Sequence, residues 1–250
     1  MRNERSVLVT GGGRGIGAAT AWRCAELGHA VAVNYTHDAA AAEAVVQRIR
    51  ASGGQALAIR ADVSDEAQVL AMFARIDAEL PPLRGLVNNA GVVDMTQRVD
   101  EMSVARWQRM FAVNVIGSFV CAREAVRRMS SRHGGAGGAI VNVSSVASRL
   151  GSAGQYVGYA ASKAAIDTFT VGLAREVATE GIRVNAVRPG TIDTEIHASG
   201  GLPDRARELA PQIPMQRAGA ADEIAQAIVW LLGDAASYTT GAVVDVTGGR

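Results

Sequence analysis

TGGGRGIG, residues 10–17, is the stretch that decides the fold of this 250-residue chain. It follows a short apolar run, and a longer stretch with helical periodicity begins inside it. Gly11, Gly15 and Gly17 lack a Cβ, which permits a tight turn, close approach of a phosphate group and close packing of a helix on a strand. A strand, a glycine-rich turn and a helix in this order predict the first βα unit of a dinucleotide-binding fold.

Short runs rich in valine and isoleucine alternate with longer alanine-rich stretches along the chain. This alternation predicts βαβ units with right-handed crossovers. We therefore expect an α/β Rossmann doubly wound fold, with a seven-stranded parallel sheet and helices on both faces, in a single domain over residues 1–250. The predicted strands are Ser6–Thr10, Ala30–Tyr35, Ala56–Asp62, Gly85–Asn88, Ala139–Ser144, Arg183–Val187 and Val243–Val246. The predicted helices begin near Gly15, Ala39, Asp65, Ser103, Tyr159 and Asp222, with a shorter one near Pro203–Ala210.

The composition argues against several classes of partner. Lysine and arginine total 25 against 24 aspartate and glutamate. The resulting net charge of +1 does not favour binding to nucleic acid or to an anionic membrane surface. Cys24 and Cys121 give no disulfide framework, and the four histidines form no pair at metal-ligand spacing. The first residues resemble neither a secretory signal nor a membrane span. These features predict a cytoplasmic protein without a metal site.

The end of the second strand bears on the choice of dinucleotide. Its sequence, VAVNYTHD, has Asn34 and Tyr35 where NAD sites usually carry an acidic residue for the adenosine ribose, and Asp38 follows only later. Arg14 in the glycine-rich turn can bind a 2′-phosphate. We therefore predict NADP(H) rather than NAD(H), with an NAD(H) enzyme as the open alternative.

Further motifs follow the later predicted strands, at the edge where open α/β sheets bind ligands. Asp62 and Val63 follow the third strand, NNAG (88–91) the fourth, VNVSS (141–145) the fifth and RPG (188–190) the sixth. With TGGGRGIG and YAASK (159–163) in this order, nearly the whole chain resembles the short-chain dehydrogenase/reductase family. Within it the chain is similar to 3-oxoacyl-carrier-protein reductases and glucose 1-dehydrogenases.

The resemblance implies hydride transfer between NADP(H) and an alcohol/carbonyl pair, such as a sugar, a 3-oxoacyl group or another small carbonyl compound. It also implies a homotetramer or homodimer. A non-catalytic NADP(H)-binding regulator is the alternative from another class, because a fold does not fix a function. The catalytic residues implied are Asn114, Ser145, Tyr159 and Lys163. The cofactor contacts expected are Gly11, Gly12, Arg14, Gly15, Ile16, Gly17, Asn34, Tyr35, Asp62, Val63, Asn89, Ala90, Gly91, Tyr159, Lys163, Pro189, Gly190, Ile192 and Thr194.

Two tyrosines precede the lysine in YVGYAASK, residues 156–163. On a helix Tyr159 and Lys163 are i and i+4 and share a face, and a nearby cation lowers the pKa of a phenol. Tyr159 is therefore the predicted general acid/base. Gly158 argues against helix further upstream, so Tyr156 is predicted to be a wall of the substrate pocket.

The position of the catalytic serine is less constrained by spacing. Thirteen residues separate Ser145 from Tyr159, one more than the family commonly has. Either the intervening loop carries an extra residue or the serine is shifted, and strand alternation turns Ser144 to the opposite face. We expect Ser145 to polarise the substrate oxygen and Asn114 to hold a water beside Lys163.

The segment after RPG, about residues 191–217, contains glycines and prolines and resembles the family's mobile substrate lid. Thr191, Ile192 and Thr194 are expected near the nicotinamide. His197 is a candidate substrate contact, and a surface loop histidine is an equally good interpretation.

Overall fold

The structure is a computed structural model that describes residues 5–250, except for the side chain of residue 197. Its main sheet has seven parallel strands in the order β3-β2-β1-β4-β5-β6-β9. The strands are β1 (Ser6–Val9), β2 (Ala30–Tyr35), β3 (Ala56–Arg60), β4 (Leu83–Asn88), β5 (Gly138–Val143), β6 (Ile182–Pro189) and β9 (Val243–Val246). The predicted Rossmann fold is confirmed, and each predicted strand lies in this sheet.

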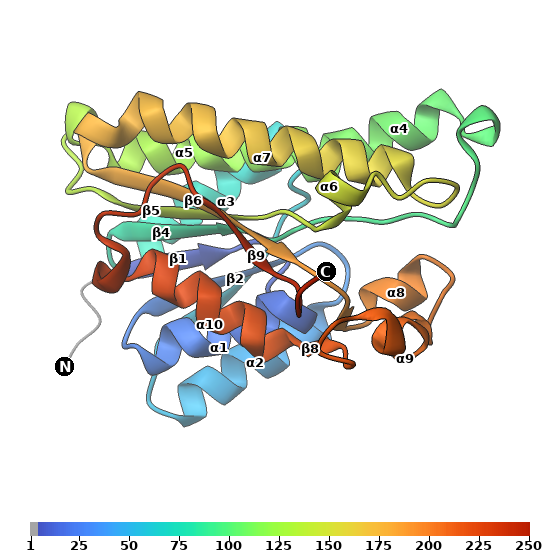
Figure 1. Cartoon of the computed structure of the whole chain (residues 1–250). Helices are drawn as coiled ribbons and strands as arrows, with labels where there is room; N and C mark the ends of the chain where they lie inside the picture. Colours follow the sequence, from blue (N-terminus) through green and yellow to red (C-terminus); the bar gives the residue numbers. More distant parts are fainter. Residues whose placement is uncertain (1–4) are drawn as a thin grey trace.

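Two layers of helices cover the sheet, one on each face (Figure 1). The longer helices are α1 (Gly15–Glu26), α2 (Ala39–Ala51), α3 (Glu66–Glu79), α4 (Val104–Phe111), α5 (Ser118–Met129), α7 (Val157–Val177) and α10 (Ala221–Leu232). Helices α3, α5 and α7 pack on one face, and α1, α2 and α10 on the other. Because valine and isoleucine on both faces of the strands are buried, the sheet lies between two apolar cores.

The remaining elements are short and were not predicted, apart from α9. They include α6 (Ala147–Leu150), α8 (Ile196–Ser199), α9 (Arg205–Leu209) and a second, two-stranded sheet of β7 (Ile192–Asp193) and β8 (Gly219–Ala220). The single-turn 3₁₀ helices are Val99–Glu101, Ser131–His133, Ala178–Glu180, Ala210–Gln212 and Asp234–Ala236.

Two helix predictions need correction. The helix predicted from Ser103 is interrupted, because a π-helical turn, η2 (Ala112–Gly117), separates α4 from α5. Helix α7 begins at Val157 rather than Tyr159, so Gly158 does not prevent helix there. A Cβ on Gly158 would lie 3.0 Å from the indole ring of Trp107, which shows that this glycine serves close helix packing instead.

The strand order fixes where a ligand can bind. β1 lies between β2 and β4, so the chain leaves β1 toward one side of the sheet and later returns to the other. At such a switch point the loops after neighbouring strands diverge and leave a crevice at the carboxyl ends of the strands. The lid helices α8 and α9 follow β6 and lie beyond that end of the sheet (Figure 1).

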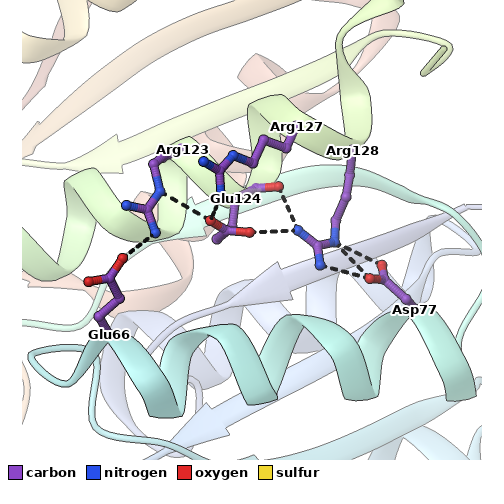
Figure 2. Close-up of polar contacts among 6 residues, drawn as sticks. All are labelled: Glu66, Asp77, Arg123, Glu124, Arg127 and Arg128. Atoms are coloured by element: carbon purple, nitrogen blue, oxygen red, sulfur yellow. Dashed lines mark hydrogen bonds and ion pairs between the residues drawn. The ribbon is translucent and has the colours of Figure 1, made fainter. Parts of the chain in front are cut away.

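A buried carboxylate joins two helices on the α3, α5 and α7 face (Figure 2). Glu124 on α5 has only 4% of its side chain exposed and accepts hydrogen bonds from Arg123, Arg127 and Arg128. Arg128 reaches Asp77 on α3 at 2.8 Å. The network fastens α5 to α3 at a distance from the crevice.

Candidate active site

The glycine-rich turn after β1 has the geometry that its sequence predicts. Gly11 and Gly15 have φ values of +61° and +52°, in the left-handed region that favours glycine. A Cβ on Gly17 would lie 2.3 Å from the Gly11 carbonyl oxygen. Any side chain at position 17 would therefore separate α1 from the turn.

Two asparagine side chains fix the glycine-rich turn by hydrogen bonds to its backbone. The Gly11 N–H donates to Asn34 Oδ1 at 3.1 Å, and Asn34 Nδ2 donates to the Ala61 carbonyl at 2.9 Å. Asn89 Nδ2 donates to the carbonyls of Thr10 and Gly11 at 2.9 and 3.0 Å. Asn34 is 1% exposed, so it supports the turn and does not face the crevice. Our expectation that Asn34 contacts the cofactor directly is corrected.

A cleft of about 530 Å³ opens beside the turn, between the ends of β1 to β4 and the start of the lid. Gly12 and Gly17 lie behind its surface with Asn34. The expected cofactor residues that line it are Gly11, Arg14, Gly15, Ile16, Tyr35, Asp62, Val63, Asn89, Ala90, Gly91 and Thr194.

The chemistry of this cleft fits a dinucleotide. Helix α1 begins there with no side-chain cap and no acidic residue in its first turn, so its N-terminus is open to a phosphate. The Arg14 side chain is exposed in the lining and makes no ion pair with any residue in 5–250. Asp38 accepts from the Ala41 N–H at 2.9 Å, which makes it the cap of α2.

A second cavity, of about 440 Å³, continues from the first toward α7 and the lid. Ile16, Asn89, Gly91 and Thr194 line both, so the two form one crevice. Of the other expected residues, Ser145, Tyr156, Tyr159, Lys163, Pro189, Gly190, Thr191 and Ile192 line the second cavity, whereas Asn114 lines neither cavity.

Ser145, Tyr159 and Lys163 meet in the wall of the second cavity. Tyr159 and Lys163 lie one turn apart on α7, and Lys163 Nζ is 5.7 Å from the centroid of the Tyr159 ring. Lys163 Nζ donates to the carbonyl of Val143, the last residue of β5, at 2.8 Å. Ser145 lies close enough to the Tyr159 hydroxyl to lower the pKa of that phenol. A substrate oxygen placed between these two hydroxyls would contact both.

The two serines after β5 face different surroundings. Ser144 is 2% exposed, and its hydroxyl donates to the Lys163 carbonyl inside α7 at 3.2 Å. Ser145 Oγ accepts from the Ala147 N–H at 3.2 Å and reaches Tyr159. Of the two serines only Ser145 is placed near Tyr159, which favours an extra residue in the loop between them, where α6 forms, over a shifted serine.

Asn114 lies in the π-helical turn and is 1% exposed. Its side chain exchanges hydrogen bonds with the Val92 backbone, at 2.8 and 3.0 Å, and donates to Ser162 Oγ at 3.1 Å. Asn114 Oδ1 and Lys163 Nζ each lie 3.4 Å from the position that a Cβ on Gly91 would take. The missing side chain at Gly91 leaves a space bordered by both polar atoms.

Burial changes the proton affinities of the tyrosine and the lysine. It raises the pKa of Tyr159, and the hydrogen bond with Ser145 only partly offsets this. The expected lowering by the lysine is not seen, because Lys163 Nζ lies over the face of the ring and donates to Val143 instead. Burial lowers the pKa of Lys163 to about 8, against an opposing effect of Asp167.

Tyr156 directly precedes α7 and is 7% exposed in the wall of the second cavity, and its role in a substrate pocket stays a prediction. Its hydroxyl donates to the Gly200 carbonyl at 3.5 Å and so contacts the lid. The predicted His197 belongs to α8, but its side chain lies outside the described part of the structure.

Sequence reasoning missed two arginines of the second cavity. Arg205 comes from the lid helix α9, and Arg250 lies beside the end of β6, where its guanidinium donates to Thr191 Oγ1 at 3.3 Å. Both are distant in sequence from every motif, and the sequence DRARE (204–208), with two basic and two acidic residues, gives no signal for Arg205.

Comparison with known proteins identifies relatives over almost the whole chain. A family model described as enoyl-(acyl carrier protein) reductase matches residues 11–250. An uncharacterized oxidoreductase of Escherichia coli, YgfF, is 58% identical over 97% of this chain and 98% of its own. A cis-4-hydroxycyclohexanecarboxylate dehydrogenase of Sinomonas cyclohexanicum is 41% identical over 98% of this chain and 96% of its own.

Solved structures agree with the fold. A short-chain type dehydrogenase/reductase from Mycobacterium marinum superposes with a TM-score of 0.92 at 36% identity, covering 99% of this chain and 95% of that one.

No helix in residues 5–250 is long and apolar enough to cross a membrane.

Proposed function

Because the chain belongs to the short-chain dehydrogenase/reductase family and is an oxidoreductase, we propose that it transfers a hydride between NADP(H) and a small alcohol/carbonyl pair. The observation that carries this proposal is the meeting of Ser145, Tyr159 and Lys163 in the wall of the second cavity, which shares lining residues with the first. The relative named as a dehydrogenase of a hydroxycyclohexanecarboxylate supports an alcohol as the reduced partner.

Each residue of the site has a distinct part in the proposed reaction. When bound, the nicotinamide supplies or accepts the hydride at the reacting carbon. Tyr159 gives a proton to the substrate oxygen during reduction and takes it back during oxidation. Ser145 donates a hydrogen bond to the same oxygen and stabilises the charge that develops on it.

Lys163 and Asn114 act behind the tyrosine. Burial outweighs any effect of Lys163 on the pKa of Tyr159 in this structure. We propose that the lysine charge favours the phenolate once substrate and cofactor exclude water from the site. The space at Gly91, bordered by Asn114 Oδ1 and Lys163 Nζ, suits a water that passes protons to the lysine. Asn114 is then a positioning residue for that water.

Replacement of Tyr159 tests the proposed chemistry. Wild type is screened with alcohols and NADP⁺, and with ketones and aldehydes and NADPH, by the nicotinamide absorbance. Tyr159→Phe keeps the ring and removes the hydroxyl, and we expect kcat/KM to fall roughly 10²- to 10⁴-fold. NADPH binding, measured by fluorescence, should be retained. Full activity in the variant would refute the role of Tyr159; an inactive wild type that binds NADPH tightly would favour the regulator.

The preference for NADP(H) is a separate part of the proposal. Tyr35 ends β2 without a carboxylate that would repel a 2′-phosphate, and Arg14 lines the same cleft with its guanidinium unpaired within residues 5–250. We expect wild type to use NADPH more efficiently than NADH. Arg14→Ala should lower kcat/KM for NADPH by roughly tenfold or more and leave the value for NADH nearly unchanged. A wild-type preference for NADH would contradict this part alone.

We also propose that the protein assembles as a homotetramer or homodimer. Val104 on α4, Ile116 on η2 and Trp230 on α10 are 61%, 52% and 43% exposed, which places large apolar side chains on two outer helical surfaces. Sedimentation at micromolar concentration should give an oligomer, and a monomer would contradict the proposal.

A further inference from the structure

The charged side chains of the second cavity all have the same sign. Lys163, Arg205 and Arg250 line it, and no aspartate or glutamate of residues 5–250 does. The rest of the lining is apolar or neutral and includes Val93, Leu150 and Leu209. An apolar pocket with several cations and no carboxylate favours a ligand that carries negative charge.

Arg205 is the cation whose surroundings point most directly to a ligand. It is the first residue of α9, half-buried, with its guanidinium carbon 5.3 Å from the centroid of the Tyr156 ring. Its Nη2 donates to the neutral Gln155 Oε1 at 2.7 Å. It makes no ion pair with the described part of the chain. A guanidinium has five N–H donors, so most of them are left for another acceptor.

Another arginine of α9 shows that an arginine of the lid can have a carboxylate partner. Arg207 points to solvent with 81% of its side chain exposed and pairs with Asp204 at 2.9 Å. The lid thus provides a carboxylate for its exposed arginine and none for the half-buried one. Because a guanidinium in an apolar pocket loses hydration, an oxyanion that pairs with it there gains more than it would at the surface.

The position of Arg205 also limits the size of the ligand. Tyr156 directly precedes α7 and Tyr159 lies in its first turn, and both line the second cavity. Arg205 lies against the first of these rings, and the proposed proton transfer occurs at the second. The charged group and the reacting carbon would then be separated by a short spacer, such as a ring or a few methylene groups.

We propose that the substrate is an alcohol or ketone that carries an oxyanion, a carboxylate or a phosphate, at the end remote from the reacting carbon, and that Arg205 binds this group. The proposal rests on the oxidoreductase function proposed above. Arg250, whose guanidinium donates to Thr191, is the second cation of the pocket and strengthens the preference for an anion.

Matched pairs of substrates test the charge requirement. Cyclic and linear hydroxy acids are compared with their primary carboxamides, which have nearly the same shape without the charge. Wild type should prefer the acid of each productive pair. In Arg205→Gln, kcat/KM for the acids should fall roughly 10- to 100-fold, while the values for the carboxamides stay within about twofold. The control Arg207→Gln should resemble wild type for both.

A structural role of Arg205 predicts a different result. If the arginine only fastens the lid to Gln155 and Tyr156, Arg205→Gln will lower kcat/KM for acids and carboxamides alike, and that outcome overturns the proposal. Equal use of acids and carboxamides by wild type overturns it as well. Arg205→Lys keeps the charge and should recover part of the selectivity for acids, which loss of lid folding would not allow.

Two further arms identify the anion and separate this proposal from the proposed function. A short-chain hydroxyalkyl phosphate is compared with the hydroxy acid of the same chain length, and an Arg205-dependent preference for the former assigns the phosphate. Calorimetry with carboxylate and carboxamide pairs in the presence of NADP⁺ measures binding without turnover. If no substrate is turned over but carboxylates bind in an Arg205-dependent way, the proposed function fails and the anion site stands; if carboxylates do not bind, the anion site fails.

Discussion

Two buried charges on the same face of the sheet, Glu124 on α5 and Lys163 on α7, have opposite surroundings. Glu124 is held by three arginines at 2.8–3.1 Å, and two of these reach on to acidic residues of α3 (Figure 2). Lys163 is 4% exposed, and within residues 5–250 it makes no ion pair. Its recorded acceptor is the Val143 carbonyl. The charge of Glu124 is thus balanced by several cations, whereas the charge of Lys163 is balanced by no carboxylate within residues 5–250.

The pKa values show what this difference means for each group. Burial alone would raise the pKa of Glu124, but hydrogen bonds from Arg128 and Arg123 more than offset it, so the pKa lies below its usual range. Burial lowers the pKa of Lys163 to about 8, which is close to neutrality. The structural charge is therefore fixed, whereas the charge in the site can change with a modest change in pH or surroundings.

Among the variants that test the contrast between Glu124 and Lys163, replacement of Lys163 should have the largest effect on kcat/KM. Lys163→Met keeps an unbranched side chain and removes the ammonium group, and we expect kcat/KM to fall roughly 10²- to 10⁴-fold because the phenolate loses its cation. Stability should not fall. Burying an unpaired charge is costly, so the free energy of unfolding at pH 7 should rise by about 1 kcal/mol or more. Substrate kinetics and denaturant unfolding measure the two effects.

The pH dependence of stability checks the same residue. The pKa of Lys163 is about 8 in the folded protein against the ordinary value of 10.5 for a lysine, so the folded protein releases this proton at a lower pH than the unfolded chain does. The destabilising contribution of Lys163 is fully present below pH 8 and disappears as the pH rises from 8 to 10.5. Wild-type stability should therefore gain from this group over that window, and Lys163→Met should lack the gain. Parallel curves for the two proteins would show that Lys163 does not bear a burial penalty.

Replacement of Glu124 should have the opposite pattern, a loss of stability with activity retained. Glu124→Gln leaves the arginines around it without their common carboxylate. We expect the free energy of unfolding to fall by about 2 kcal/mol, less than for a fully buried pair because the arginines are partly exposed. For a chain of this size the melting temperature should fall by roughly 4–8 °C.

Glu66→Gln is the matched control for this prediction. Glu66 also pairs with Arg123, at 2.7 Å, but 58% of its side chain is exposed. Its replacement should change stability by less than about 1 kcal/mol. The kcat/KM of correctly folded Glu124→Gln should equal that of wild type. A large loss of activity in the folded variant would mean that α5 influences the site, and the separation of structural from chemical charge would be wrong.

The sequence predicted the two regions unequally, for physical reasons. Helix α7 and the ends of the strands follow from local pattern, because period and glycine position depend on neighbouring residues. The pairing of Tyr159 with Lys163 needs only the i, i+4 spacing of one helix. The ion pairs of Arg123 and Arg128 with α3 and the Arg205 contact with Tyr156 join residues from separate elements, and one sequence gives no sign of such contacts.

Asn34 and the π-helical turn show a second limit. An asparagine at the end of β2 can face the crevice or bind the backbone of the glycine-rich turn. Which of the two occurs depends on the path of that turn in three dimensions, and in this structure Asn34 binds the Gly11 N–H. The π-helical turn adds a residue to a helix whose sequence, FAVNVIG (111–117), has no proline or other obvious break. It changes the direction in which Asn114 points, which helical periodicity does not predict.

Asp167 gives the finest test of how Lys163 is tuned. It follows Lys163 by one turn of α7, opposes the lowering of the lysine pKa, and pairs with Arg188 at 2.9 Å. Asp167→Asn should lower the pKa of Lys163 further, so that activity falls at a lower pH than in wild type. Because Arg188 already balances much of the aspartate charge, we expect only about a threefold loss of kcat/KM at pH 8.

The control for Asp167 lies on the far side of Arg188. Asp245 pairs with Arg188 at 3.3 Å and also with Arg149, but it is not among the groups that shift the pKa of Lys163. Asp245→Asn should therefore leave the pH profile of kcat/KM unchanged. If both variants shift the profile equally, Arg188 rather than Asp167 controls the lysine. If neither variant shifts the profile, burial alone sets the pKa of Lys163. Lys163 would then have no charged neighbour that affects its proton, whereas Glu124 has three.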